Sequence, residues 1–223
     1  MSQAHNGAHP PIMTQKLPIF PLQLVVFPGE PLNLHIFEER YRELIADVEA
    51  TGSTFCVATV INGDLQEVAT EVSLTEVARR YPGGESDVRT VGQRLFFLED
   101  NWKTLPGKLY PGGLARELPV DFDEDQVINR EIVRLTREIY RELNIDKTIR
   151  DADAGFLTYD IGHYVGLRIE QEYELLTMRK ASRRQRFLLN HLREIRPELQ
   201  QGQRIRNRAA LNGHFQELKP PEW

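Results

Sequence analysis

The sequence predicts an α+β fold, in which a curled β-sheet lobe with one early helix is followed by a lobe of packed helices. Two observations predict this fold. Up to about residue 118, short apolar and β-branched runs alternate with Gly, Pro and Asn turn sequences, which is typical of strands. Beyond residue 119, apolar residues recur at spacings of three and four, which is typical of helices. Such helices bury their apolar stripes only against each other or against a sheet, so we expect two lobes.

This pattern divides the 223 residues into four parts. They are a flexible tail at 1–16, a β-rich lobe at 17–122, a helical bundle lobe at 123–208 and a C-terminal tail at 209–223. The first tail is polar and has no apolar run, which predicts neither a signal peptide nor a membrane span. The single cysteine, Cys56, excludes an internal disulfide and indicates a reducing compartment. We therefore expect a cytoplasmic protein.

The segment at 17–44 is apolar, but prolines interrupt it at positions 18, 21, 28 and 31. Because proline lacks the N–H that a strand interior donates, we expect short extended pieces at the edge or rim of the sheet. A turn at residues 27–29 folds these pieces over, and a helix is expected to follow over residues 38–50. Tyr41 begins an apolar stripe on that helix, and Gly52 is placed to end it with a left-handed cap.

Further strands are expected along the first lobe. A continuous apolar run at 54–61 predicts a buried central strand that ends in an Asn-Gly-Asp turn. The Pro-Gly-Gly sequence at 82–84 predicts a hairpin, with Gly92 as a bulge in its second strand. A last strand is expected at 113–118. Several short strands with one helix indicate a small, curled, partly closed sheet.

The second lobe is predicted to contain four helices. Acidic residues at 121–125 precede the first helix, because the partial positive charge of a helix N-terminus favours them there. Gly166 is placed to end the second helix. Ser182 and Gln185 have the spacing of a capping box at the start of the last helix. The expected helices cover residues 128–144, 154–165, 169–178 and 182–199.

The net charge of −5 conceals a strong asymmetry. Residues 1–178 carry 17 Lys+Arg against 29 Asp+Glu, a net charge of −12. Residues 179–208 carry 10 basic and 2 acidic side chains, a net charge of +8. This basic block is either a nucleic-acid surface or the positive face of a helix that docks on acidic neighbours in the same protein. We favour the second interpretation, because the rest of the chain is strongly acidic.

The spacing of the reactive residues predicts no catalytic, cofactor or metal site. None of the six histidines pairs with another His, Cys or carboxylate at zinc-ligand spacing. The acidic run at 121–125 lacks the glycine and the distal glutamate of an EF-hand loop, so helix capping explains it better. Cys56 lies within an apolar strand, where the thiolate of a nucleophile is disfavoured. His35 alternates with Leu34 and Ile36, so we expect it to face away from them at the sheet surface.

The segment at 17–44 resembles the opening of the N-terminal, substrate-binding domain of the Lon protease family. Its Ile-Phe-Glu-Glu-Arg-Tyr block is similar to that of stand-alone Lon-domain proteins of bacteria. The resemblance continues more weakly at 91–99 and 174–192, so that it spans roughly residues 17–200. The matching residues are Leu17, Pro18, Pro21, Leu22, Val25 to Gly29, Leu34 and the block Ile36 to Tyr41.

This resemblance implies a PUA-like pseudo-barrel for the β-rich lobe, and a non-catalytic module that binds polypeptide. The chain contains neither the Gly-x-x-x-x-Gly-Lys-[Ser/Thr] loop of an ATPase nor a Gly-x-Ser-x-Gly nucleophile motif. We therefore expect a protein that holds unfolded or extended polypeptide, with a protease or chaperone as its partner, and that neither unfolds nor cuts it. No cofactor and no membrane partner are expected.

The proline-interrupted apolar segment is the candidate surface for binding polypeptide. Three adjacent apolar residues in a turn cannot all point inward, so we expect part of the run at 25–27 to face solvent. Phe37 and Tyr41 are expected to line a neighbouring wall, and His35 to contact the bound peptide. For each residue the alternative is that it closes the barrel or packs against the first helix. The candidate residues are Val25, Val26, Phe27, His35, Phe37 and Tyr41.

The alternative function is binding of RNA or another nucleic acid, because PUA-like folds also bind RNA and residues 179–208 are basic. The acidic β-rich lobe and the absence of an aromatic-rich basic sheet face argue against it, so nucleic acid is the disfavoured partner. The two functions differ in their response to salt. Phosphate binding weakens steeply as salt is added, whereas binding through apolar contacts hardly changes.

Overall fold

The computed structural model describes residues 14–211, with side chains for residues 14–197. Residues 1–13 and 212–223, which the sequence analysis assigns to the two tails, lie outside the described residues. The rest of each predicted tail is regular, because the first strand begins at Thr14 and the last helix ends at Leu211.

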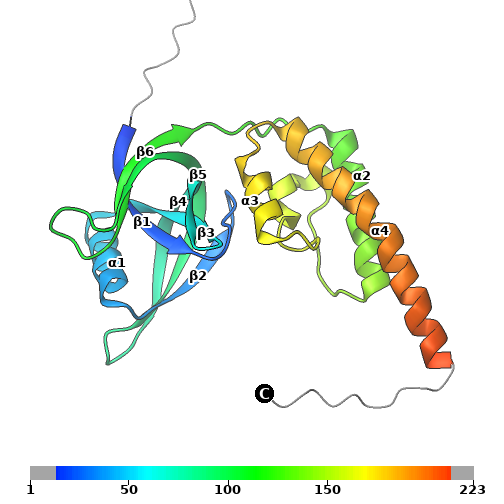
Figure 1. The fold of residues 1–223 in the computed structure, drawn as a ribbon, viewed down its shortest axis with the longest axis horizontal. Coiled ribbons are helices and arrows are strands. Elements are labelled where there is room, and N and C mark those ends of the chain that lie inside the picture. The colour runs from blue at the N-terminus through cyan, green and yellow to red at the C-terminus, as the bar shows by residue number, and fades with distance from the viewer. Residues whose placement is uncertain (1–13, 212–223) are drawn as a thin grey trace, which may run out of the picture. The chain divides into compact units, whose positions relative to one another are not determined.

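The described chain forms two compact units (Figure 1). Unit 1 holds the described residues up to Asp121 together with Leu167–Arg179. Unit 2 holds Phe122–Gly166 together with the described residues from Lys180 onward. The predicted α+β class is confirmed, with the strands in unit 1 and the two long helices in unit 2.

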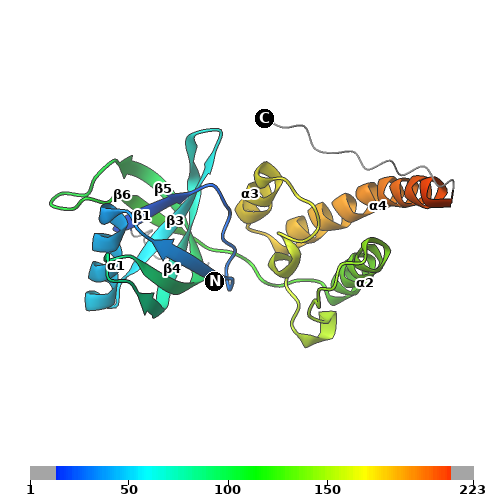
Figure 2. The same cartoon turned by 90° about the horizontal axis from the view of Figure 1, so that it is seen from below.

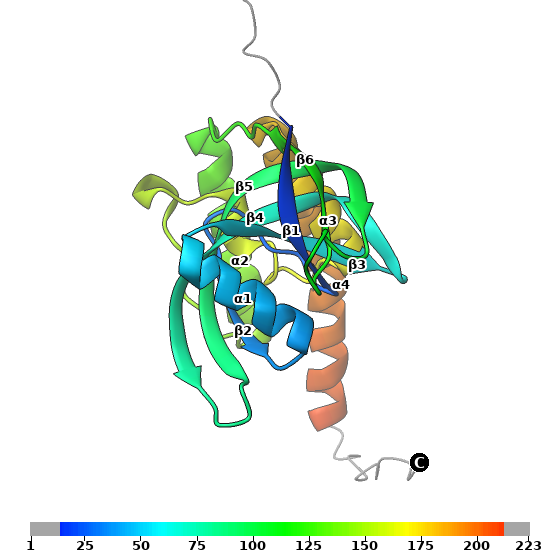
Figure 3. The ribbon, with the colours of Figure 1, turned by 90° about the vertical axis from the view of Figure 1, so that its left-hand side faces the viewer.

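Unit 1 is built on one curled, mixed sheet of six strands in the order β2-β5-β4-β3-β1-β6. A further pairing of β5 with β6 closes five of these strands into a barrel (Figures 1 and 3). The long strand β5 pairs with β4 on one side. On its other side, residues 86–91 pair with β2 and residues 95–102 pair with β6. The elements of unit 1 are β1 (Thr14–Leu22), β2 (Pro31–Ile36), α1 (Glu39–Thr51), β3 (Thr54–Ile61), β4 (Asp64–Arg80), β5 (Ser86–Trp102), β6 (Gly112–Leu118) and α3 (Ile169–Thr177).

The predicted edge position of the proline-interrupted segment is confirmed for β2, which ends the sheet, and is wrong for β1, which lies inside the closed sheet. Its first half pairs with β6 and its second half with β3. The Ile19 N–H donates to the Pro111 carbonyl (2.9 Å), so odd-numbered N–H groups point towards β6 and even-numbered ones towards β3. Pro18 therefore faces β3 just before that pairing begins, and Pro21 faces β6 after that pairing has ended. Neither proline removes a ladder hydrogen bond, which is why the strand tolerates both.

The run Val25-Val26-Phe27 is buried, with exposed fractions of 1%, 2% and 1%. The expectation that part of this run faces solvent is therefore wrong. The Thr70 hydroxyl donates to the Val26 carbonyl, and a Cβ atom at Gly92 would lie 2.3 Å from the Phe27 carbonyl oxygen. Because Gly92 has no side chain, this run can cross β5 at close range, and the predicted bulge is present at the same position.

The helix α1 packs against the sheet of unit 1 (Figure 3). It ends at Gly52 in the left-handed conformation (φ 67°), as the sequence predicts. The ring of Tyr41 stacks on that of Phe20, with centroids 4.0 Å apart. Both belong to a core cluster that also contains Val26 and Phe55. The apolar stripe of the helix is thus entirely used for packing.

The helix α3 belongs to unit 1, whereas the sequence predicts it within the helical lobe. The Val68 N–H of β4 donates to the Tyr173 hydroxyl of α3 (2.8 Å). The Asp121 N–H donates to the Arg179 carbonyl (2.8 Å), which ties the two chain segments of the unit together. The apolar residues of this nine-residue helix indicate that one of its faces is buried. They do not indicate whether a sheet or another helix buries it.

Unit 2 contains two long helices that lie side by side (Figures 1 and 2). Apolar side chains at the helical spacing expected beyond residue 119 are buried on both helices, at Ile132, Leu135 and Ile139 on one and at Leu188 and Leu192 on the other. Among the described residues, no helix combines the length and the apolar character that crossing a membrane requires. The elements of unit 2 are α2 (Gln126–Leu143), η1 (Ala152–Ala154), η2 (Thr158–Ile161) and α4 (Ala181–Leu211).

The prediction of a helix over residues 154–165 is wrong. This part of the chain contains only the end of η1, the short turn η2 and irregular structure. Gly155 adopts a left-handed conformation (φ 82°) directly after η1, and Leu157 is extended (φ −118°, ψ 150°). Both conformations prevent one helix from running through the segment.

The predicted role of the acidic run at the start of α2 is confirmed at Asp125, whose carboxylate accepts two backbone N–H groups of the first turn (2.8 and 3.1 Å). Gln185, predicted to form a capping box with Ser182, instead uses its side chain to bind residues at the start of α2. Its side chain accepts the Asp125 N–H (3.2 Å) and donates to the Asn129 side chain (2.8 Å). Gln185 therefore joins α4 to the start of α2.

Arg184 and Glu124 form a buried ion pair in unit 2. Their side chains are 0% and 2% exposed, and Arg184 Nη2 lies 3.4 Å from Glu124 Oε1. The Glu124 carboxylate also accepts hydrogen bonds from the N–H and hydroxyl of Thr158 and from the Asn129 amide. The guanidinium lies 4.7 Å from the ring centroid of Tyr159. This network connects α2, η2 and α4.

Other arginines of the basic block at 179–208 also pair with acidic residues of unit 2. Arg196 lies 2.8 Å from Glu138, and Arg193 lies 3.9 Å from Glu131. These contacts support the interpretation that the positive face of this helix docks on acidic neighbours in the same protein. The side chains beyond residue 197 lie outside the described part of the chain.

Candidate functional site

The strand β2 is an edge strand, and within the described chain it pairs only with β5. The Gly92 N–H donates to the Glu30 carbonyl (2.8 Å), which sets the alternation of the antiparallel ladder. Even-numbered positions of β2 therefore exchange hydrogen bonds with β5. The backbone N–H and C=O groups of Asn33 and His35 point to the other side, where they can pair with another extended chain.

Natural edge strands are commonly protected by charged side chains, by proline or by a bulge. In β2 the proline, Pro31, is at the first position, and the one titratable side chain is that of His35. The pairing with β5 runs through all six residues without a register shift. The outer edge of β2 is therefore regular and unprotected over most of its length.

Aromatic and polar side chains lie beside this edge. Phe37 is 62% exposed, and its ring centroid lies 6.1 Å from that of His35. The ring of Tyr81 meets His35 edge-on, with centroids 5.8 Å apart. A groove of about 410 Å³ runs along the same side of the β2, β4 and β5 strands. We call the group the β2 edge surface, and its members are Asn33, His35, Phe37, Tyr81, Asp87 and Arg89.

The Asp87 carboxylate orients two rings of the β2 edge surface. One of its oxygens lies 2.7 Å from His35 Nδ1, and the other accepts the Tyr81 hydroxyl (2.7 Å). These two hydrogen bonds, with that of His35 the stronger, lower the pKa of Asp87 below its usual value. The same hydrogen bond to Asp87 raises the pKa of Tyr81. Asp87 is therefore ionised at neutral pH and holds both rings in place.

Two of the six candidate residues, His35 and Phe37, lie on the β2 edge surface. Tyr41 is 6% exposed and packs in the core, and this burial raises the pKa of its hydroxyl. The run at 25–27 is buried beneath the crossing at Gly92. The burial of these four residues agrees with the alternative that they close the barrel and pack against α1.

Sequence pattern alone does not mark the other members of the β2 edge surface, which are Asn33, Tyr81, Asp87 and Arg89. His35 and Asp87 are 52 positions apart, and only the pairing of β2 with β5 brings them together. The Pro-Gly-Gly sequence predicted the hairpin that carries Tyr81, but not the strand that pairs beside it. Strand order is set by long-range contacts, which a local pattern does not contain.

Two further kinds of reactive group lie in the described chain, the single thiol and the metal-binding side chains. Burial raises the pKa of the Cys56 thiol far above its ordinary value, so the thiolate is not formed at neutral pH. Among the side chains described, those of residues 14–197, no group of three or more His, Cys, Asp or Glu is placed to hold a metal ion. The arrangement at β2 offers backbone pairing and side-chain contact.

Comparisons with known proteins agree with this fold. A family model described as the ATP-dependent protease La (LON) substrate-binding domain matches residues 16–194. A solved Lon N-terminal domain protein from Xanthomonas campestris is 27% identical with a TM-score of 0.60, and the match covers 79% of this chain and 98% of that chain. The N-terminal domain of the Mycobacterium avium complex Lon protease, 19% identical, has a similar fold with a TM-score of 0.56, covering 80% of this chain and 98% of that one. A search of curated proteins found no match.

Proposed function

Because the chain belongs to the family of ATP-dependent protease La (LON) substrate-binding domains, we propose that it binds extended segments of unfolded polypeptide along the outer edge of β2. The observation that carries this proposal is the unpaired edge of β2 beside the exposed ring of Phe37. The family itself was indicated by the sequence resemblance, which the match over residues 16–194 confirms.

The bound segment adds to the sheet as a further strand. Its backbone exchanges hydrogen bonds with the outward N–H and C=O groups of Asn33 and His35. Hydrogen bonds between main chains do not depend on the sequence of the bound segment. This mode of binding therefore suits a module that holds many different unfolded chains.

Side chains of the bound strand alternate between the two faces of the sheet. On one face they meet the rings of Phe37 and His35, which supply apolar contact area. The groove of about 410 Å³ on the same side receives one further side chain, with Arg89 and Asp87 in its lining. Affinity then comes from backbone pairing and from apolar burial together.

We further propose that the protein acts without catalysis and without a cofactor, in the cytoplasm, as the binding partner of a protease or chaperone. The family match supports a non-catalytic role, and the single buried, unpaired cysteine suits a reducing compartment. The internal ion pairs of Arg193 and Arg196 leave less of the basic block for nucleic acid, so the polypeptide is the favoured ligand.

The edge is tested by comparing Asn33→Pro with Asn33→Ser. Proline removes one outward N–H and adds bulk at the edge, whereas serine keeps the N–H and loses only the amide side chain. We expect Asn33→Pro to weaken binding of a labelled, reduced and carboxymethylated protein by about tenfold, as the loss of one hydrogen bond and of close approach requires. Fluorescence anisotropy measures this affinity, and Asn33→Ser is expected to bind as the wild type does. Equal binding by both variants would exclude pairing at β2.

The apolar contact is tested by comparing Phe37→Ser with Leu109→Ser. Both remove an exposed apolar side chain from unit 1, since Phe37 is 62% and Leu109 50% exposed. We expect Phe37→Ser to weaken binding about five- to thirtyfold, because roughly 1–2 kcal/mol of apolar burial is lost, and Leu109→Ser to change it little. The anisotropy titration is repeated at about 0.05 M and about 0.5 M salt, and the affinity is expected to change little. A steep loss at high salt would instead point to binding of phosphate or another charged ligand.

A further inference from the structure

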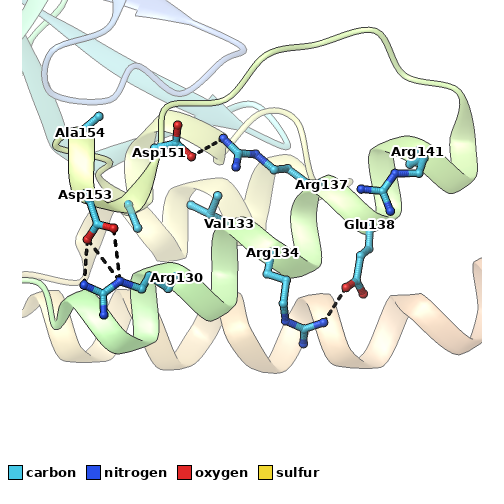
Figure 4. Close-up of a pocket in the computed structure, with 10 residues that line it drawn as sticks. Arg130, Val133, Arg134, Arg137, Glu138, Arg141, Asp151, Asp153 and Ala154 are labelled. Atoms are coloured by element: carbon cyan, nitrogen blue, oxygen red, sulfur yellow. Dashed lines mark hydrogen bonds and ion pairs between the residues drawn. The ribbon is translucent and has the colours of Figure 1, made fainter.

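Unit 2 carries a groove that the proposed function does not use. It has a volume of about 600 Å³ and lies between α2 and the segment at 151–154 (Figure 4). Pockets that bind small ligands have volumes of about 300–1,000 Å³. The buried side chains of Val133 and Ala152 contribute to its lining. The groove is therefore large enough to hold part of another chain.

One wall of the groove is a stripe of arginines on α2. Arg130, Arg134, Arg137 and Arg141 follow one another at spacings of four, three and four, so they share one face of the helix over about 16 Å. All four side chains are exposed. The planar guanidinium group is suited to paired hydrogen bonds with a carboxylate.

The opposite wall presents two aspartates to this stripe. Arg130 Nη2 lies 2.9 Å from Asp153, and Arg137 Nη2 lies 2.7 Å from Asp151 (Figure 4). The Asp153 and Asp151 side chains are 70% and 66% exposed. Arg130 holds Asp153 with both Nε (3.2 Å) and Nη2 (2.9 Å), and Arg137 Nη2 also donates to the Ile149 carbonyl (3.2 Å). Both ion pairs are exposed, where solvent and salt weaken them, so another carboxylate can compete with Asp151 and Asp153 for these arginines.

Arg141 extends the stripe beyond the two aspartates. In the described part of the chain its guanidinium takes part in no ion pair, and Figure 4 draws it without a contact to the other lining residues. Arg134 is held by Glu131 and Glu138 on the same helix (2.9 and 2.6 Å). In the groove, Arg130 and Arg137 therefore pair with exposed aspartates for which a ligand can compete. Arg141 is available to pair with a further carboxylate of the ligand.

We propose that this groove binds an acidic segment of polypeptide, in which two carboxylates take the places of Asp151 and Asp153 and a further one reaches Arg141. The Asp-x-Asp spacing of the chain already fits the separation of Arg130 and Arg137. The segment at 151–154 therefore imitates the ligand and competes with it.

The charge of the lining favours an acidic peptide over nucleic acid. Four arginines share the lining with Glu138, Asp151 and Asp153, so the groove carries only one excess positive charge. Binding to a continuous phosphate backbone calls for a strongly basic surface. A peptide with a few carboxylates matches the groove better.

The test uses the full chain and a labelled peptide of alternating Asp and Gly, with an Asn-Gly peptide as the uncharged control. Asp151→Asn/Asp153→Asn is expected to tighten binding about three- to tenfold, because the competing carboxylates are gone. Arg130→Gln/Arg137→Gln is expected to weaken binding about tenfold, because two carboxylate partners are lost. Fluorescence anisotropy gives the affinities, and circular dichroism confirms that each variant is folded.

Asp146→Asn/Glu194→Gln is the matched control, since it removes two negative charges from exposed positions of unit 2 outside the groove lining. If this control gains as much affinity as Asp151→Asn/Asp153→Asn, the proposal is overturned. The lower negative charge of the whole protein would then explain the tighter binding of the acidic peptide by both variants. Tighter binding of a single-stranded RNA oligonucleotide than of the acidic peptide would overturn it as well. Asn33→Pro should leave binding of the acidic peptide unchanged. The proposals for the α2 groove and for the β2 edge surface can therefore be tested independently.

Discussion

Phe27→Asp is expected to unfold unit 1. The Phe27 side chain is 1% exposed, and its backbone packs against β5 at Gly92. Truncation of a buried phenylalanine costs about 3–5 kcal/mol, and a buried unpaired carboxylate costs more. Because a domain is typically stable by only about 5–15 kcal/mol, this substitution removes most of the stability. Thermal and urea unfolding followed by circular dichroism measure the loss.

Phe37→Asp is the matched control, because it makes the same chemical change at a side chain that is 62% exposed. Its free energy of unfolding is expected to stay within about 0.5–1 kcal/mol of the wild type. From the sequence alone, Phe27 either closes the barrel or packs against the first helix, or, as a candidate binding residue, contacts a bound chain. A Phe27→Asp variant with normal stability and weakened polypeptide binding would restore that interpretation and contradict the buried position of Phe27.

Arg184→Met is expected to destabilise unit 2 by about 3–5 kcal/mol, because it leaves the carboxylate of Glu124 buried without its cationic partner. Methionine keeps much of the length and apolar volume of arginine, so lost packing against Tyr159 contributes less. Thermal unfolding measured by the helical signal in circular dichroism reports the change, since unit 2 is largely helical.

The double variant Glu124→Gln/Arg184→Met separates the charge from the packing. Glutamine removes the buried negative charge but keeps an oxygen that accepts the Thr158 hydrogen bonds. We expect the double variant to be more stable than Arg184→Met alone, which a double-mutant cycle shows as coupling between the two sites. Arg193→Met, on the same helix and 58% exposed, is expected to cost less than about 1 kcal/mol. If both arginine variants lose the same small amount, the buried pair does not hold the unit together.

These two expectations concern the scaffold, and they set the conditions for testing the binding surfaces. Substitutions at Asn33, Phe37 and the exposed charges of the α2 groove leave the buried residues untouched. Loss of binding in those variants can therefore be attributed to the surface. Loss of binding in a Phe27 or Arg184 variant reports unfolding first.

Local elements of the fold were predictable where sequence pattern and burial agree. The stripe that begins at Tyr41 and the glycine at position 52 predicted α1 and its left-handed cap. The acidic run predicted the capping role of Asp125, and Gly92 predicted a bulge. For α1 and α2 the residues that determine the structure lie within a few positions of one another, whereas Gly92 also admits the distant run at 25–27.

Predictions failed where distant segments decide the outcome. Pro18 and Pro21 suggested an edge strand, but the switch of β1 from one neighbour to the other leaves both prolines at unpaired positions. Gln185 had the spacing of a capping residue, but Asp125 and Asn129 offer its side chain buried partners. Buried polar groups need hydrogen-bond partners. Contacts between distant segments that supply such partners therefore override the pairing that a local motif predicts.

The sequence by itself determined the α+β class, most of the helices and strands, and the family to which the chain belongs, because periodicity and turn residues act over short distances. The proline-interrupted segment also predicted an edge position, which the structure gives to β2 and not to β1. Only the tertiary structure decided that Val25 to Phe27 are buried, which of the two strands lies at the edge, and that Arg184 is enclosed. These properties depend on which surfaces cover one another. Strand order and packing between residues far apart in the chain determine which surfaces are covered. The type of a side chain does not by itself determine how exposed it is.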